Sequence, residues 1–202
     1  MLLADVVATS GVVGATRSRR AKTAAFAALF ERLAEAEPEE IQTVTSYLAG
    51  SLRQRRTGLG WRSMQSLPSP AGEPSLTVQE VHGAFERIAA LSGAGSQAAR
   101  AEATEALFAR ATAEEQPWLR GIVTGEVRQG ALDSLVQEGL AAAGGVPLAA
   151  VRRAAMMAGS TVAVSVAALT GGEEALASYG LCLLYTSPSP RDRTRSRMPS
   201  SA

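Results

Sequence analysis

Arginines flanked by glycines offer the clearest chemistry in this sequence. In Gly125-Glu126-Val127-Arg128-Gln129-Gly130, one arginine lies between two glycines, after one apolar segment and before the next. Glycine allows backbone amides to approach an anion closely, and a guanidinium binds a phosphate through two parallel hydrogen bonds. Arg128 and Gly130 are therefore predicted to bind a phosphate group. The alternative is that Arg128 only caps the preceding helix.

A second segment, residues 51–62, combines the same two residue types. It contains several arginines, two glycines and Trp61. Glycines let backbone amides reach a phosphate, and arginines neutralise its charge. The candidates for phosphate binding in this segment are Arg53, Arg56, Gly58 and Gly60.

A third basic cluster, Arg17, Arg19, Arg20 and Lys22, lies at the predicted start of a helix. The helix dipole favours acidic residues at that end, so cations there are unexpected. One interpretation is that an anion binds at this cluster. The other is that these side chains form an ordinary solvated face.

Several classes of site are excluded by residues that occur only once. Lys22 is the only lysine, His82 the only histidine and Cys182 the only cysteine. An intrachain disulfide and cysteine-based metal sites are therefore excluded, and a histidine-rich metal site or a catalytic triad would depend on His82 alone. No acidic cluster accompanies His82, which we expect on a helix surface.

The composition predicts an all-α fold. Hydrophobic residues make up 46% of the 202 residues and aromatic residues only 4%, so the core must consist largely of Ala, Leu and Val. Small side chains of this kind suit packed helices better than a sheet. The net charge of +1 does not indicate a nucleic-acid-binding protein, so a DNA-binding face would require local clustering of arginines.

Apolar residues recur at helical spacing through most of the chain. Thr77-Val78-Gln79-Glu80 and Thr112-Ala113-Glu114-Glu115 have the capping-box pattern, and residues 67–74 are predicted to form an exposed connector. Helices are expected at about residues 2–9, 17–36, 38–50, 77–91, 99–108, 112–123, 132–143, 147–158 and 161–169.

No membrane segment is predicted. The apolar run 154–170 is interrupted by polar residues and is shorter than the roughly 20 residues that a membrane span needs. The N-terminus lacks the basic start of a secretory signal, and Asp5 interrupts its apolar run. A cytoplasmic protein is expected.

The composition changes after about Tyr179. Residues 182–197 have no helical periodicity, and the last part of them alternates Arg with Ser or Thr. We therefore predict a helical domain over residues 1–178 and a disordered tail over 179–202. The tail also resembles sequencing-adapter DNA translated in frame, in which case it is artefactual.

A set of short motifs follows in order along about residues 1–180. These motifs are Leu2-Leu3-Ala4-Asp5-Val6-Val7, the Arg/Lys-rich segment 17–22, Tyr47-Leu48-Ala49-Gly50, Gly58-Leu59-Gly60-Trp61, Glu115-Gln116-Pro117-Trp118-Leu119, Gly125-Glu126-Val127-Arg128-Gln129-Gly130, Val151-Arg152-Arg153-Ala154 and Glu173-Glu174-Ala175-Leu176. In these motifs the chain resembles the N-terminal DNA-binding domain of ATP-dependent DNA ligases of the actinobacterial and archaeal kind. The ordered set is more specific than any one motif.

This resemblance implies that the helical domain binds duplex DNA across the minor groove around a nick, with separate adenylation and OB domains following it. The family's motif of Gly, a charged residue, Leu or Val, Arg, any residue and Gly matches residues 125–130, so Arg128 would be its DNA-contacting arginine. Contacts to phosphates and sugars suit a protein that must act at any sequence.

The catalytic motif of that family is absent from this chain. A ligase uses the lysine of a Lys-x-Asp-Gly motif to take AMP from ATP, whereas Lys22 is followed by Thr23-Ala24-Ala25. We therefore expect a truncated ligase: the parent would be an enzyme that uses ATP and Mg, and this fragment would be inactive alone and hold no cofactor.

The preferred hypothesis is sequence-independent binding of nicked duplex DNA, by a monomer, in the service of DNA replication, repair or recombination. The candidate contacts are Arg17, Arg19, Arg20, Lys22, Arg53, Arg56, Gly58, Gly60, Arg128, Gly130 and Arg152. One alternative is a helical protein-interaction scaffold whose arginines are merely solvated. A sequence-specific helix-turn-helix regulator is disfavoured, because no short helix pair with a polar recognition helix stands out.

Overall fold

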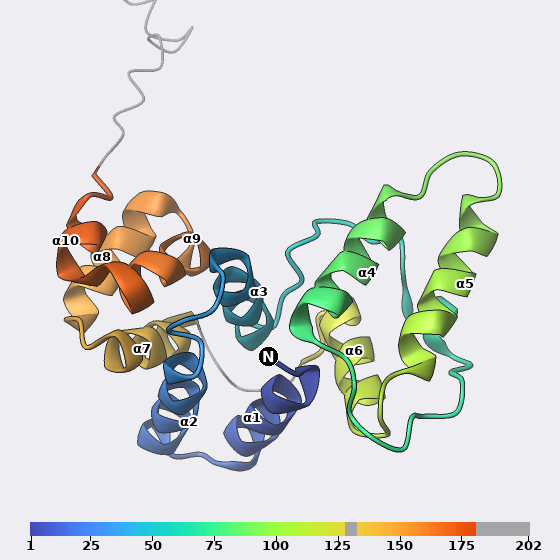
Figure 1. The fold of residues 1–202 in the computed structure, drawn as a ribbon, viewed down its shortest axis with the longest axis horizontal. Coiled ribbons are helices and arrows are strands. Elements are labelled where there is room, and N and C mark those ends of the chain that lie inside the picture. The colour runs from blue at the N-terminus through green and yellow to red at the C-terminus, as the bar shows by residue number, and fades with distance from the viewer. Residues whose placement is uncertain (128–132, 181–202) are drawn as a thin grey trace, which may run out of the picture.

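The regular structure of this chain is helical (Figure 1). A computed structural model describes residues 1–127 and 133–180, and neither range contains a β-strand, which confirms the predicted all-α fold. The helices are α1 (Leu3–Ala15), α2 (Arg19–Glu31), α3 (Pro38–Leu48), the 3₁₀ helix η1 (Trp61–Met64), α4 (Val78–Ala90), α5 (Ser96–Ala109), α6 (Glu115–Thr124), α7 (Asp133–Gly144), α8 (Leu148–Ala158), α9 (Thr161–Val166), the π-helix η2 (Ala167–Gly171) and α10 (Gly172–Ala177).

The predicted capping boxes form at the starts of α4 and α6. Thr77 Oγ1 accepts a hydrogen bond from the Glu80 amide at 3.2 Å, and the Glu80 carboxylate accepts one from the Thr77 amide at 2.9 Å. The bond from the Thr77 amide, together with hydrogen bonds from Arg110 and from the Thr77 hydroxyl, lowers the pKa of Glu80 to about 2. Thr112 and Glu115 form the same reciprocal pair, at 2.8 and 3.3 Å. Each box satisfies amides that a helix start would otherwise leave without a partner.

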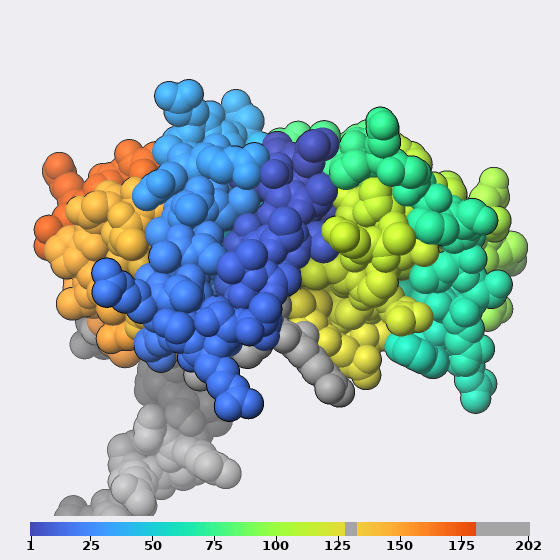
Figure 2. All heavy atoms as spheres, turned by 90° about the horizontal axis from the view of Figure 1, so that it is seen from below, coloured from blue at the N-terminus to red at the C-terminus, as the bar shows by residue number. Residues whose placement is uncertain are grey.

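Helix α1 lies between α2 and α6 (Figure 2). The indole nitrogen of Trp118 in α6 donates a hydrogen bond to Ser10 Oγ in α1 at 3.1 Å. The same indole packs edge-on against the buried ring of Tyr47 in α3, with ring centroids 5.6 Å apart. These contacts fix α6, and the segment that follows it, relative to α1 and α3.

Helix α7 packs closely against two neighbouring helices. It lies along α2 on one side and against η2 on another. A Cβ added at Gly139 would be 2.6 Å from Phe26 Cβ in α2, and one added at Gly144 would overlap the carbonyl oxygen of Ala168 in η2. Both glycines are therefore required by close approach of neighbouring helices.

Three expectations about local structure are corrected. Helix α1 continues through Ser10 and Gly11 to Ala15, because burial of Val13 stabilises the additional turn. The apolar region 161–169 is divided between α9 and η2. His82 is 6% exposed and not on the surface, and its ring nitrogens lie against Gln54 and Glu39.

The predicted connector at 67–74 contains no helix, as expected. The predicted disordered tail lies almost entirely outside the described residues, since only Tyr179 and Gly180 of it are described. Among the described helices, none has the length and apolar character that spanning a bilayer requires.

Candidate nucleic-acid interface

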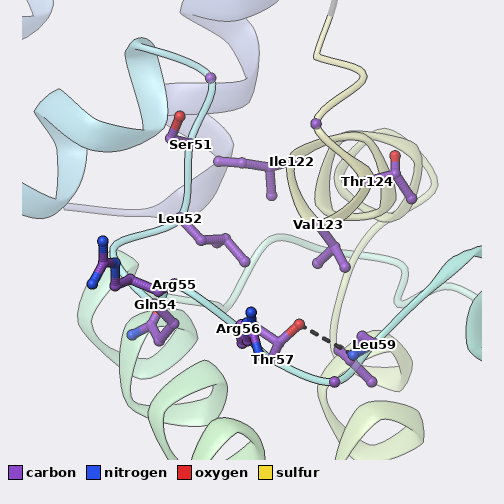
Figure 3. A pocket seen from close by; sticks show the side chains of 13 residues that line it. Ser51, Leu52, Gln54, Arg55, Arg56, Thr57, Leu59, Ile122, Val123 and Thr124 are labelled. Atoms are coloured by element: carbon purple, nitrogen blue, oxygen red, sulfur yellow. Dashed lines mark hydrogen bonds between the residues drawn. The ribbon is translucent and has the colours of Figure 1, made fainter.

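A surface groove lies between the loop after α3 and the C-terminal end of α6 (Figure 3). Its volume is about 500 Å³. We call it the loop groove, and it is lined by Gly50, Ser51, Leu52, Gln54, Arg55, Arg56, Thr57, Gly58, Leu59, Ile122, Val123, Thr124 and Gly125. It brings the basic segment 51–62 next to Gly125, the first residue of the second segment that the sequence singles out for phosphate binding.

The charge of the loop groove is positive. Arg55 and Arg56 are both exposed and both line it, and no lining residue is acidic. Within residues 1–127 and 133–180, no ion pair includes either arginine. Two cationic side chains are therefore available to an anionic ligand in a groove that no carboxylate neutralises.

The backbone of the loop is shaped by Gly58. Its φ of +70° lies in the left-handed region, and a Cβ there would be 3.0 Å from the guanidinium of Arg100. That guanidinium is held in place by a 2.6 Å hydrogen bond to the carbonyl oxygen of Leu91. Beside it, Thr57 Oγ1 accepts a hydrogen bond from the Leu59 amide at 3.2 Å. Contact with Arg100 of α5 thus holds the loop in place, while Arg55 and Arg56 remain exposed.

The opposite wall of the loop groove ends at Gly125. This glycine terminates α6 with a φ of +72°, and the Glu126 amide donates to the carbonyl oxygen of Gly121 at 2.7 Å. The chain then leads directly into residues 128–132. Arg128 and Gly130 lie outside the described residues, so their predicted role stays a prediction.

Arg53 faces away from the loop groove and toward α3. Its guanidinium donates to Thr43 Oγ1 at 3.2 Å and to Gln42 Oε1 at 3.1 Å, and it lies 3.6 Å from a carboxylate oxygen of Glu39. The next residue, Gln54, lies 3.0 Å from Nδ1 of the buried His82. Together these contacts tie the start of the loop to α3 and α4.

A second set of candidate residues meets around one carboxylate. The Glu138 cluster consists of Arg19, Thr23, Glu138 and Arg152, from α2, α7 and α8. Arg19 Nε lies 3.2 Å from both Glu138 oxygens, Thr23 Oγ1 donates to one at 3.0 Å, and Arg152 reaches the other at 3.4 Å. The hydrogen bonds from Arg19 lower the pKa of Glu138, with smaller contributions from Thr23 and from the charge of Arg152. The cluster has two cations and one anion.

The other predicted residues occupy separate positions. Arg17 lies in the exposed connection between α1 and α2, and Arg20 is exposed in the first turn of α2, where Lys22 is half-buried. Gly60 precedes η1 and exchanges hydrogen bonds with Ser63 Oγ at 2.8 and 2.9 Å. Of the predicted contacts that lie within the described residues, only Arg56 and Gly58 line the loop groove.

Two arginines that were not predicted as contacts lie at or near the loop groove. Arg55 lines the loop groove beside Arg56, and Arg120 in α6 lies over the ring of Trp61 with 4.8 Å from its guanidinium carbon to the ring centroid. Composition could have suggested Arg55, because it lies within the basic segment. The pairing of Arg120 with Trp61 depends on the tertiary fold.

The described residues include no group of three or more His, Cys, Asp or Glu side chains arranged to hold a metal ion. The groups in the loop groove that could bind an anion are two guanidinium groups and the backbone at its glycines. Such groups bind a polyanion through its backbone; they do not by themselves form or break covalent bonds.

Comparison with known proteins gives consistent matches. The sequence profile described as "DNA ligase N terminus" matches residues 62–141. The chain is 67% identical over 186 residues to a "Probable DNA ligase" of Nocardioides sp., which covers 90% of this chain and 36% of that protein. It is 64% identical over 181 residues to a "Probable DNA ligase" of Kineococcus radiotolerans, and this match also covers 90% of this chain and 36% of that protein. The chain therefore spans about a third of the length of the curated relatives it matches.

Proposed function

This chain is related to the DNA ligases over their N-terminal region, and from that premise we propose that residues 1–178 bind duplex DNA without regard to its sequence. In this proposal the loop groove holds the sugar-phosphate backbone, with Arg55 and Arg56 against phosphates and Gly58 allowing close approach. The observation that carries the proposal is the pair of exposed arginines, Arg55 and Arg56, which have no acidic partner in the described part of the chain and which line the same groove as Gly125.

Backbone recognition suits the chemistry of the loop groove. Duplex DNA carries closely spaced negative charges, and arginines that meet them release condensed counterions. Contacts to phosphate and sugar position a protein on DNA but carry no sequence information. A protein that uses such contacts can act at a nick in any sequence.

The whole protein is proposed to be an ATP-dependent DNA ligase that acts as a monomer in replication, repair or recombination. This sequence contains no Lys-x-Asp-Gly segment, and Lys22 is followed by Thr23-Ala24-Ala25. Formation of the lysine–AMP bond, with ATP and Mg, is therefore assigned to the part of the protein that the relatives have and this chain does not span.

The proposal is tested by fluorescence anisotropy with the full 202-residue chain and labelled duplexes of two unrelated sequences, each nicked or intact. We expect the logarithm of the association constant to fall linearly with the logarithm of salt concentration, with a slope of about −3 to −5 for roughly three to five phosphate contacts. Both sequences should bind equally. Absence of binding at low salt, or a salt-independent affinity, would contradict the proposal.

A charge-neutralising substitution in the Glu138 cluster is expected to strengthen DNA binding. The Glu138 carboxylate competes with phosphate for Arg19 and Arg152. Glu138→Gln removes that negative charge and keeps an acceptor for Thr23. We expect duplex affinity at low salt to rise about threefold to tenfold, with a steeper salt dependence, in the same anisotropy assay.

Glu105→Gln in α5 is the matched control, because Glu105 is exposed and belongs to no ion pair within the described ranges. It makes the same change in net charge away from the Glu138 cluster. Equal effects of the two substitutions would mean that Arg19 and Arg152 do not meet DNA specifically.

A further inference from the structure

Trp61 is a large aromatic residue that the fold leaves on the surface. It begins η1 and is 51% exposed, whereas Trp118 is 9% exposed and hydrogen-bonded to Ser10. The guanidinium of Arg120 lies over the Trp61 ring, with its carbon 4.8 Å from the ring centroid. One face of the indole is therefore occupied by a cation, while half of the residue's surface remains accessible.

The Trp61–Arg120 pair adjoins the loop groove. Arg120 is three and four residues before Val123 and Thr124 in α6, a spacing that places all three on one side of the helix. Val123, Thr124 and Leu59 line the loop groove, and Leu59 is two residues before Trp61. The pair thus extends the positively charged groove at the side where α6 meets η1.

An accessible indole beside a basic groove has a specific use in nucleic-acid binding. Bases of single-stranded DNA stack on aromatic side chains, and arginine strengthens such sites. In an intact duplex the face of each base is covered by the neighbouring bases, so Trp61 has no free base face on which to stack. An unpaired base beside a duplex, as in a gap, has a free face.

We propose that Trp61 and Arg120 form a subsite for an unpaired base next to the duplex held in the loop groove. The subsite rests on the proposed function and adds a substrate preference to it: DNA with a single-stranded gap beside duplex binds more tightly than intact duplex. Trp61 supplies the stacking surface, and Arg120 fixes the orientation of the indole and contributes positive charge.

Anisotropy titrations of the full chain with three labelled DNAs test the subsite: an intact duplex, the same duplex with a short gap, and single-stranded oligothymidylate. The wild type should bind the gapped duplex about tenfold more tightly than the intact one. Trp61→Leu should bind the two duplexes equally and keep intact-duplex affinity within about twofold, because the loop groove is unchanged. Trp61→Phe should keep most of the gap preference, because phenylalanine also stacks.

Intrinsic fluorescence provides a second readout, since Trp61 and Trp118 are the two tryptophans of the chain. Gapped duplex should quench the emission of the wild type and leave that of Trp61→Phe, which reports the buried Trp118, nearly unchanged. Circular dichroism melting of each variant shows that it is folded.

The outcomes separate the two proposals. If none of the three DNAs binds, both the proposed function and the subsite are overturned. Salt-sensitive duplex binding without a gap preference, or a gap preference that Trp61→Leu retains, overturns the subsite alone. In that case the Trp61–Arg120 contact serves only to attach η1 to α6.

Discussion

Replacing Arg55 and Arg56 together by alanine is expected to weaken duplex binding by about tenfold to a hundredfold at low salt. Hydrogen bonds from charged groups contribute roughly 1.5–3 kcal/mol each when desolvated, and less at an exposed site such as this one. The slope of the salt dependence should fall in magnitude by about 2, since each lost phosphate contact removes about 0.9. Anisotropy titrations at several salt concentrations measure both quantities.

The control for this variant removes two other arginines. Arg87 and Arg110 line a separate groove between α4 and α5, where Arg110 is paired with Glu80. Arg87→Ala with Arg110→Ala changes the net charge by the same amount and should alter duplex affinity by about threefold or less. If both double variants lose affinity equally, binding depends on overall charge and the loop groove has no special role.

Gly144→Ala is expected to destabilise the fold by about 3 kcal/mol. An added methyl group would overlap the backbone carbonyl of Ala168, and a backbone atom cannot rotate away as a side chain can. The end of α7 must therefore separate from η2, which removes contacts from a close-packed region. Urea unfolding followed by circular dichroism gives the change in free energy.

Gly11→Ala is the matched control for Gly144→Ala. Gly11 lies within α1, and a Cβ there would meet nothing within 4 Å. Alanine is favoured over glycine in helices, so this substitution should stabilise the fold by about 0.5–1 kcal/mol. A Gly144→Ala variant as stable as the wild type would show that α7 and η2 are not in such close contact.

Sequence patterns were sufficient to predict most of the helices, because caps and apolar spacing are local. Thr77 and Glu80 form their capping box as expected, and Gly125 ends α6. The length of α1 was underestimated because its two glycines suggested an end, whereas burial of Val13 favours another turn. Burial depends on distant helices that no local pattern reveals.

The sequence was less informative about which arginines are available to a ligand. Arg53 and Arg56 look alike in the chain, but Arg53 binds Glu39, Gln42 and Thr43 while Arg56 lines the loop groove. Arg19 and Arg152 meet at Glu138 although they are far apart in sequence. Ion pairs between distant segments determine which of these arginines are available to a ligand, and residue type alone does not reveal such pairs.

The predicted role of Arg128 depends on the segment between Gly125 and α7. Gly125 ends α6 and lines the loop groove, and residues 128–132 lie outside the described part of the chain. Arg128 remains a prediction in its own right, and the loop-groove proposal depends on Arg55 and Arg56 without it.

Hydrogen exchange with mass spectrometry, with and without saturating nicked duplex, shows whether DNA binds in the loop groove. We expect slower exchange in peptides from residues 50–60 and 121–127, which form the two walls of the loop groove, and unchanged exchange around Arg87 and Arg110. Protection confined to α4 and α5, or no protection at all while the DNA is bound, would contradict the assignment of the loop groove as the DNA-binding site.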